Sequence, residues 1–147
     1  MKVAVLMGSA NDRAKMAPAL ETLAEFGVEA EEHVMSAHRT PARVAEFARG
    51  ARVAGYAVVI CGAGMAAHLA GAVAANTTLP VIGVPLSGGA LNGVDALYAT
   101  VQMPRGIPVA TVAVDGSLNA ALLAVEVLAV SDARLADRLA EYRAGWA

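Results

Sequence analysis

Short apolar runs alternate with longer amphipathic segments along the whole chain. The runs that predict strands are residues 3–7, 28–35, 57–61, 80–85 and 109–114. The segments that predict helices are residues 14–26, 41–54, 66–75, 95–102, 119–130 and 132–144. Strict alternation of strand and helix predicts a parallel sheet covered by helices on both faces. Continuously apolar strands indicate the same, because strands exposed on one face alternate between apolar and polar residues.

The number and order of these elements predict a fold class. Five predicted strands in a chain of 147 residues fit one α/β domain over residues 1–147. The expected architecture is a flavodoxin-like three-layer sandwich, a five-stranded parallel sheet with helices on both faces and a C-terminal helix. In such sheets ligands bind beyond the carboxyl ends of the strands, near the point where strand order reverses. The residues that follow the predicted strands are therefore the candidates for ligand binding and chemistry.

The segment Ser36-Ala37-His38-Arg39-Thr40-Pro41 follows the second predicted strand and opens a helix. Proline suits the first turn of a helix, and threonine before it suits the N-cap. A helix N-terminus favours anions, histidine titrates near neutral pH, and arginine binds phosphate through a planar fork of donors. The segment predicts a proton-transfer group beside an anchor for a phosphorylated substrate. A solvated turn that happens to carry two basic residues is the alternative.

The other predicted strands also end in small or polar residues. Gly8, Ser9 and Asp12 follow the first strand, residues 62–64 with His68 follow the third, and a glycine-rich segment, 87–93, follows the fourth. Glycine allows a backbone N–H to approach an anion closely. Together these ends predict a phosphate and sugar pocket around His38.

Each of these residues has a structural alternative. Ser9 can simply cap the first helix, Asp12 can complement its dipole, and His68 can be an ordinary helix residue. His33 lies inside a predicted strand, where a structural role is favoured. Cys61 has no basic neighbour in the sequence, which favours a small core residue.

Composition narrows the class of protein. Hydrophobic residues make up 57% of the chain and charged residues 16%, so we expect surface buried in subunit contacts. A net charge of −2 without a basic run disfavours nucleic acid. One cysteine excludes an intrachain disulfide, and there is no signal-peptide layout or membrane-length apolar run, so a cytoplasmic location is expected. The three histidines lack metal-ligand spacing, and a Walker-type phosphate loop is missing.

Several motifs at matching spacing carry a family resemblance over nearly the whole chain. They are Met7-Gly8-Ser9 with Asp12, then residues 36–41, 62–69, 79–85, 91–95, 101–104 and 108–113, and Asn119-Ala120. On these residues the chain resembles the PurE family of purine biosynthesis. Arg39 and the run Ala66-Ala67-His68-Leu69 resemble the class I mutases rather than the class II carboxylases, which have lysine after the histidine.

The resemblance implies a reaction and a set of roles. It implies conversion of N5-carboxyaminoimidazole ribonucleotide to 4-carboxy-5-aminoimidazole ribonucleotide, with His38 as the proton-transfer residue. It implies substrate binding without a metal or other cofactor, and assembly as a homo-octamer. The substrate-binding positions that it implies are Ser9, Asp12, Ser36, Arg39, Gly64, Ala66, His68 and Leu69.

The chain also departs from the family pattern. Asn11 and Arg13 flank Asp12 where the family has serine and tryptophan, Met65 replaces a common glycine, and Ala70 replaces a common proline. Methionine is costly at residue 65 if the backbone there has a positive φ. Two other functions stay open: class II carboxylation of aminoimidazole ribonucleotide with free CO2, and a non-catalytic nucleotide-binding module.

Overall fold

The computed structural model describes residues 1–146 as an alternating series of strands and helices. The strands are β1 (Lys2–Met7), β2 (Glu29–Val34), β3 (Tyr56–Gly64), β4 (Val81–Leu86) and β5 (Ala110–Thr111). The helices are η1 (Ala10–Asp12, a 3-10 turn), α1 (Arg13–Glu25), α2 (Pro41–Gly50), α3 (Leu69–Ala74), α4 (Val94–Val101), α5 (Ser117–Ala129) and α6 (Ala133–Ala144). Among residues 1–146, none of these helices is long and apolar enough to cross a bilayer.

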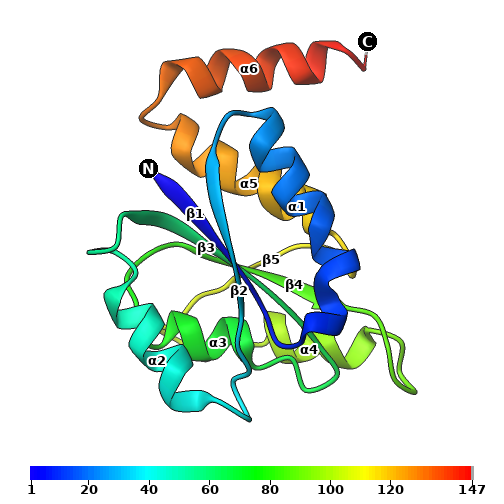
Figure 1. Cartoon of the computed structure of the whole chain (residues 1–147). Helices are drawn as coiled ribbons and strands as arrows, with labels where there is room; N and C mark the ends of the chain where they lie inside the picture. The colour runs from blue at the N-terminus through cyan, green and yellow to red at the C-terminus, as the bar shows by residue number, and fades with distance from the viewer. Residues whose placement is uncertain (147) are drawn as a thin grey trace.

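The sheet is parallel throughout and has the order β2-β1-β3-β4-β5. Helices α1 and α5 cover one face, helices α2, α3 and α4 cover the other, and α6 lies beyond α5 (Figure 1). The predicted flavodoxin-like three-layer sandwich is therefore confirmed. Strand order reverses between β1 and β3, so a ligand is expected at the carboxyl ends of these two strands.

Strand β1, which lies between β2 and β3, is buried on both faces. Val3 and Val5 pack into the core under α1 and α5, whereas Ala4 and Leu6 pack into the core under α2 and α3. The alternation follows from the pleat, which turns successive side chains to opposite faces. Because β1 packs in both hydrophobic cores, its carboxyl end is fixed in position and can support a ligand-binding site.

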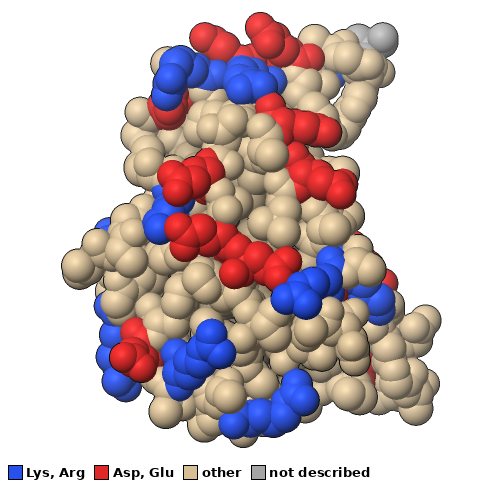
Figure 2. Space-filling model, in the orientation of Figure 1, with Lys and Arg blue, Asp and Glu red and all other residues tan. Residues whose placement is uncertain are grey.

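Edge strand β2 differs from the expectation of continuously apolar strands. Its sequence is Glu-Ala-Glu-Glu-His-Val, and its side chains are exposed or half-buried. Lys2 pairs with Glu31 at 2.5 Å, and Arg13 pairs with Glu32 at 2.8 Å. Acidic and basic side chains are mixed on the face shown in Figure 2. An edge strand has only one neighbour, and charged side chains there discourage pairing with another chain.

The structure corrects the predicted bounds of strands at the site end of the sheet. Strand β3 continues through residues 62–64, which pair with β4, instead of ending at Cys61. A Cβ atom at Gly62 would overlap the side chain of Met16, so this glycine serves close packing. Strand β5, at the other edge of the sheet, is two residues long rather than six, and only Ala110 and Thr111 pair with β4.

Two helices end or begin three or more residues away from their predicted bounds. Helix α2 ends at Gly50, and turns carry the chain to Gly55, whose φ of 89° closes the segment. Helix α3 begins at Leu69 rather than at Ala66. At the end of α1 the prediction is confirmed: Gly27, with φ of 70°, donates its N–H to the carbonyl of Ala24.

Gly83 in β4 offers a test of how tightly α4 packs on the sheet. A Cβ atom at Gly83 would overlap the methyl group of Thr100, whose hydroxyl is held by the carbonyl of Ala96 at 2.7 Å. We expect Gly83→Ala to lower the free energy of unfolding by about 1–3 kcal/mol, measured by urea denaturation. Gly50→Ala is the matched control: it meets no atom within 4 Å and should not destabilise. Equal stability of the two variants would contradict the packing argument.

Candidate active site

A cavity of about 500 Å³ opens at the carboxyl ends of β1, β3 and β4, at the reversal of strand order. Every predicted site residue lines it: Ser9, Asp12, Ser36, His38, Arg39, Gly64, Ala66, His68 and Leu69. The fold thus gathers residues from three separate parts of the sequence.

Ser9 and Asp12 form a capping box at the end of β1. The N–H of Ser9 donates to Asp12 Oδ2 at 3.0 Å, and the N–H of Asn11 donates to Ser9 Oγ at 3.2 Å. Burial raises the pKa of the Asp12 carboxyl and outweighs the opposing effects of the Ser9 N–H, Lys15 and Arg39. Ser9 therefore does cap a helical turn, as the structural alternative proposed, and the side chains of Ser9 and Asp12 also line the cavity.

The loop that carries His38 is closed by its own side chains. Ser36 Oγ accepts the N–H groups of His38 and Arg39 at 3.3 and 3.2 Å. Thr40 occupies the N-cap position of α2, but its hydroxyl bonds to the backbone of Ser36 instead of capping the helix. Pro41 starts α2 as predicted. The turn holds residues 38 and 39 in place before any substrate binds.

Arg39 connects this loop to β1. Its Nη2 donates to the carbonyl oxygen of Gly8 at 3.0 Å, and its charge acts on Asp12. The residue itself is exposed, so most of its guanidinium donors remain accessible from the cavity side. A cation with free planar donors is suited to a phosphate group.

His38 and His68 are in direct contact. Nε2 of His38 lies 2.7 Å from Nδ1 of His68, and the two rings meet edge to face at 81°. One nitrogen donates and the other accepts, so a single proton bridges the rings. His68 is the N-cap of α3 rather than a residue within it. The ordinary helix histidine considered from the sequence is thus replaced by a partner of His38.

Met65 shapes the turn between β3 and α3. Its φ is 51°, the left-handed conformation that makes a non-glycine residue costly by about 1–2 kcal/mol. The turn explains why α3 starts late, because the N–H groups of Ala67 and His68 bond to carbonyls only two residues back. The Met65 side chain lies close to Gly89, and both residues line the cavity.

Ser87, Gly88 and Gly89 line the cavity as a wall, at the place expected for the glycine-rich segment after β4. A contact between two histidines of the site was not predicted. The contact between His38 and His68 joins residues 30 positions apart. Both residues follow strands that are consecutive in the sequence, β2 and β3, but these strands lie on either side of β1, so the strand order was needed to bring the two histidines together.

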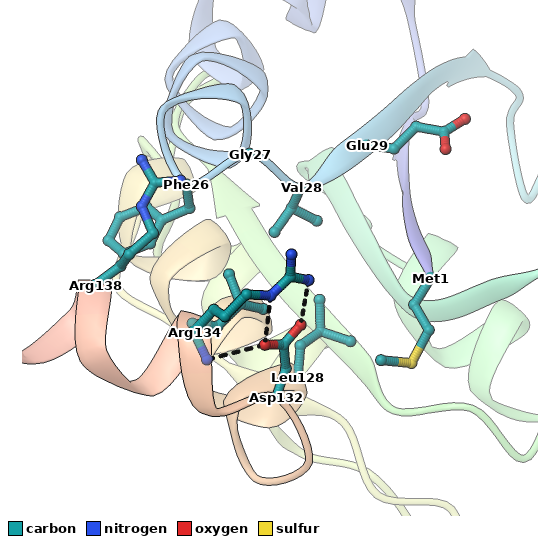
Figure 3. A pocket seen from close by; sticks show the side chains of 10 residues that line it. Met1, Phe26, Gly27, Val28, Glu29, Leu128, Asp132, Arg134 and Arg138 are labelled. Carbon is teal, nitrogen blue, oxygen red and sulfur yellow. Dashed lines mark hydrogen bonds and ion pairs between the residues drawn. The ribbon is translucent and has the colours of Figure 1, made fainter.

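The rest of the described chain has fewer groups suited to catalysis or metal binding. Among residues 1–146, no group of three His, Cys, Asp or Glu side chains is placed to hold a metal ion. A second cavity of about 430 Å³ lies between the start of β2 and the α5–α6 corner (Figure 3). There Arg134 pairs with Asp132, and Arg138 donates to the carbonyl of Glu25. Both arginines are thus bonded within the chain, and neither histidine nor cysteine lines this cavity.

His33 lies away from the cavity, as its predicted structural role requires. Its Nε2 is 2.9 Å from the hydroxyl of Tyr56, and its ring packs against Phe47. Burial lowers the pKa of His33, an effect that the nearby Glu31 opposes. The unfolded chain therefore takes up a proton first as pH falls below about 6.5, and stability falls with it.

The lowered pKa of His33 can be tested through the pH dependence of stability. We expect the free energy of unfolding to drop more between pH 7.5 and 5.5 in the wild type than in His33→Gln, which keeps a donor for Tyr56. Urea denaturation at both pH values measures the two slopes. Equal slopes would contradict a depressed pKa at His33.

Comparison with known proteins adds independent information. A family model described as AIR carboxylase matches residues 2–147. A Saccharolobus solfataricus protein named N5-carboxyaminoimidazole ribonucleotide mutase is 52% identical over 96% of this chain and 89% of its own length. A Candida albicans protein named phosphoribosylaminoimidazole carboxylase is 51% identical over 95% of this chain and 25% of its own length. The crystal structure of Treponema denticola PurE superposes with a TM-score of 0.89 at 29% identity, covering 97% of this chain and 89% of that chain.

Proposed function

Because the chain belongs to the AIR carboxylase family, we propose that it is an N5-carboxyaminoimidazole ribonucleotide mutase. The reaction converts that ribonucleotide to 4-carboxy-5-aminoimidazole ribonucleotide, a step of purine biosynthesis that makes the protein an isomerase. The observation that carries the proposal is the contact of His38 with His68 beside Arg39 in one cavity. This arrangement supplies proton transfer and anion binding at one place.

The strand ends supply the binding groups. Arg39, with Ser9 and Ser36 near it, binds the 5′-phosphate, and Asp12 accepts hydrogen bonds from the ribose hydroxyls. Gly64, Ala66, His68 and Leu69 face the imidazole ring and its carboxyl group. Binding energy from the phosphate and ribose then holds the ring where the reaction occurs.

His38 serves first as an acid and then as a base. Its imidazolium protonates the exocyclic nitrogen of the substrate while the bond from that nitrogen to the carboxyl carbon breaks and releases CO2. C4 of the ring attacks the CO2 and forms the new carbon–carbon bond. Neutral His38 then removes the proton from C4, which restores the aromatic ring and the imidazolium. One residue whose type titrates near neutral pH can perform both transfers.

The surroundings of His38 support this cycle. His68 holds Nε2 of His38 at 2.7 Å, so it orients the ring and shares the proton between the two steps. The cavity keeps CO2 next to C4, and such confinement can contribute about 7–11 kcal/mol in favourable cases. Apart from the substrate, the cycle uses groups of the chain alone, without a metal, a nucleoside triphosphate or biotin.

An assay with two substrates tests the function. The purified protein receives either N5-carboxyaminoimidazole ribonucleotide, or aminoimidazole ribonucleotide with bicarbonate, and the 4-carboxylated product is followed by its absorbance. A mutase turns over the first substrate much faster than the second. Faster turnover of the second would make the protein a class II carboxylase, and binding without turnover of either would make it a nucleotide-binding module.

We also propose that the protein works as a homo-oligomer in the cytoplasm, and the resemblance implies an octamer. The exposed side of α4 and the loop before it carries the apolar side chains of Leu91, Val94, Tyr98 and Val101, which are 45–61% exposed. Such a stripe is typical of an interaction surface. Light scattering of the purified protein measures the number of copies, and a monomer would contradict the proposal.

Burial raises the pKa of the Cys61 thiol, which makes it unreactive.

A further inference from the structure

Ser87, where β4 ends and the cavity wall begins, is held by two charged residues from other elements. Lys15 in α1 donates from Nζ to the carbonyl oxygen of Ser87 at 2.5 Å and to its Oγ at 2.7 Å. Asp115, after β5, accepts the N–H of Ser87 through Oδ1 at 2.9 Å. The two charges lie 3.8 Å apart. Ser87 thus has its N–H, carbonyl and hydroxyl all bonded to one ion pair.

Asp115 is itself fixed in position. Its backbone has a φ of 57°, and its N–H donates to the carbonyl of Pro85 at 2.9 Å. Burial favours the neutral carboxyl, but hydrogen bonds from Ser87 and the charge of Lys15 outweigh it and lower the pKa of Asp115. The acceptor therefore stays ionised at neutral pH, which strengthens its bond to Ser87.

The wall beyond Ser87 has little else to hold it. Gly88 and Gly89 have φ of 141° and 64°, and a Cβ atom at Gly88 would meet nothing within 4 Å. Gly89 comes close to the flexible side chain of Met65. Glycines that lack packing contacts give a backbone many accessible conformations. The position of this wall thus depends on how firmly Ser87 is held.

We infer that Lys15 and Asp115 are positioning residues that clamp Ser87 and thereby fix the Gly88–Gly89 wall of the substrate cavity. Neither residue lines the cavity, so both act through Ser87. The clamp keeps the wall in the conformation that accepts substrate, and loss of the clamp lowers the fraction of molecules in that conformation. Affinity falls by that fraction, whereas the proton transfers at His38 keep their rate. The kinetic part of this inference rests on the proposed mutase function.

The test compares three variants. Lys15→Met removes the ammonium and keeps most of the side-chain length, whereas Lys15→Arg restores a cation. The bond from Ser117 Oγ to the backbone carbonyl of Lys15, at 2.6 Å, does not depend on the side chain, so packing of α1 on α5 is kept. Lys2→Met is the matched control, because Lys2 is the other lysine of the chain and pairs with Glu31 at β2.

Two readouts separate the clamp from the function. Hydrogen exchange of the Ser87 amide, whose N–H is bonded to Asp115, should become faster by about tenfold in Lys15→Met, stay unchanged in Lys2→Met, and be partly restored in Lys15→Arg. KM for the ribonucleotide should rise about fivefold in Lys15→Met, with kcat within about twofold of the wild type.

Unchanged exchange in Lys15→Met would overturn the clamp. Faster exchange with an unchanged KM, or with a loss confined to kcat, would overturn its role in substrate binding. A wild type without turnover would contradict the proposed function instead, and the exchange measurement would still decide whether Lys15 fixes the wall.

Discussion

Replacing His38 with Asn is expected to reduce kcat by about 100- to 10,000-fold or more, because one side chain performs both proton transfers. Asparagine keeps the N–H that Ser36 Oγ accepts, so the loop from Ser36 to Thr40 should stay closed. It lacks an imidazole that can give and take a proton, and it loses the contact with His68. Steady-state assays measure turnover, and calorimetric titration with the ribonucleotide measures affinity.

Binding should change far less than turnover in this variant. Arg39, Ser9 and Asp12 keep their places, so we expect the dissociation constant to stay within about tenfold of the wild type. His33→Gln is the control, because His33 lies outside the cavity and should retain activity. Turnover of His38→Asn near the wild-type rate would remove this residue from the mechanism.

The alternation of strands and helices, and hence the three-layer architecture, was predictable because it depends on local patterns of apolar residues. Continuous apolar runs such as residues 57–61 and 80–85 marked buried strands, and the glycine after the first helix marked its end. The site could be placed at the strand ends for the same reason, since parallel strands end at one edge of the sheet. Local chemistry and topology together therefore located the cavity.

The strand and helix ends at the cavity could not be predicted, because tertiary packing decides them. Gly62 and Gly64 looked like a loop, but Met16 fills the space beside Gly62 and the strand continues through both. Met65 adopts a left-handed conformation that its type disfavours, and α3 starts after it. Departures from local preference thus gather at the site, where strained residues are often found.

The contacts that define the site chemically were also hidden in the sequence. Lys15 and Ser87 are separated by 72 positions, so no spacing pattern joins them. His68 seemed as suited to a helix surface as to a pocket until the position of α3 brought it to His38. Such long-range pairs require the strand order, which local patterns do not provide.

Replacing Arg39 with Ala is expected to raise KM for the ribonucleotide by about 10- to 150-fold. Hydrogen bonds to charged groups contribute about 1.5–3 kcal/mol each, and every 1.4 kcal/mol corresponds to a tenfold change in binding. The guanidinium is already placed by its bond to the carbonyl of Gly8 at 3.0 Å, so little ordering is needed on binding. kcat should fall less than KM rises, since Arg39 binds a part of the substrate remote from the reacting carbon.

Two further variants distinguish phosphate binding from a general effect of charge. Arg39→Lys should give an intermediate KM, because an ammonium keeps the charge but lacks the planar fork. Arg43→Ala makes the same charge change on α2, outside the cavity, and should leave KM near the wild-type value. Equal increases in KM for Arg39→Ala and Arg43→Ala would mean that the net charge of the surface attracts the substrate and that Arg39 makes no specific contact. A dependence of KM on salt in the wild type that disappears only in Arg39→Ala would instead place the phosphate at this guanidinium, because salt screens an exposed ion pair.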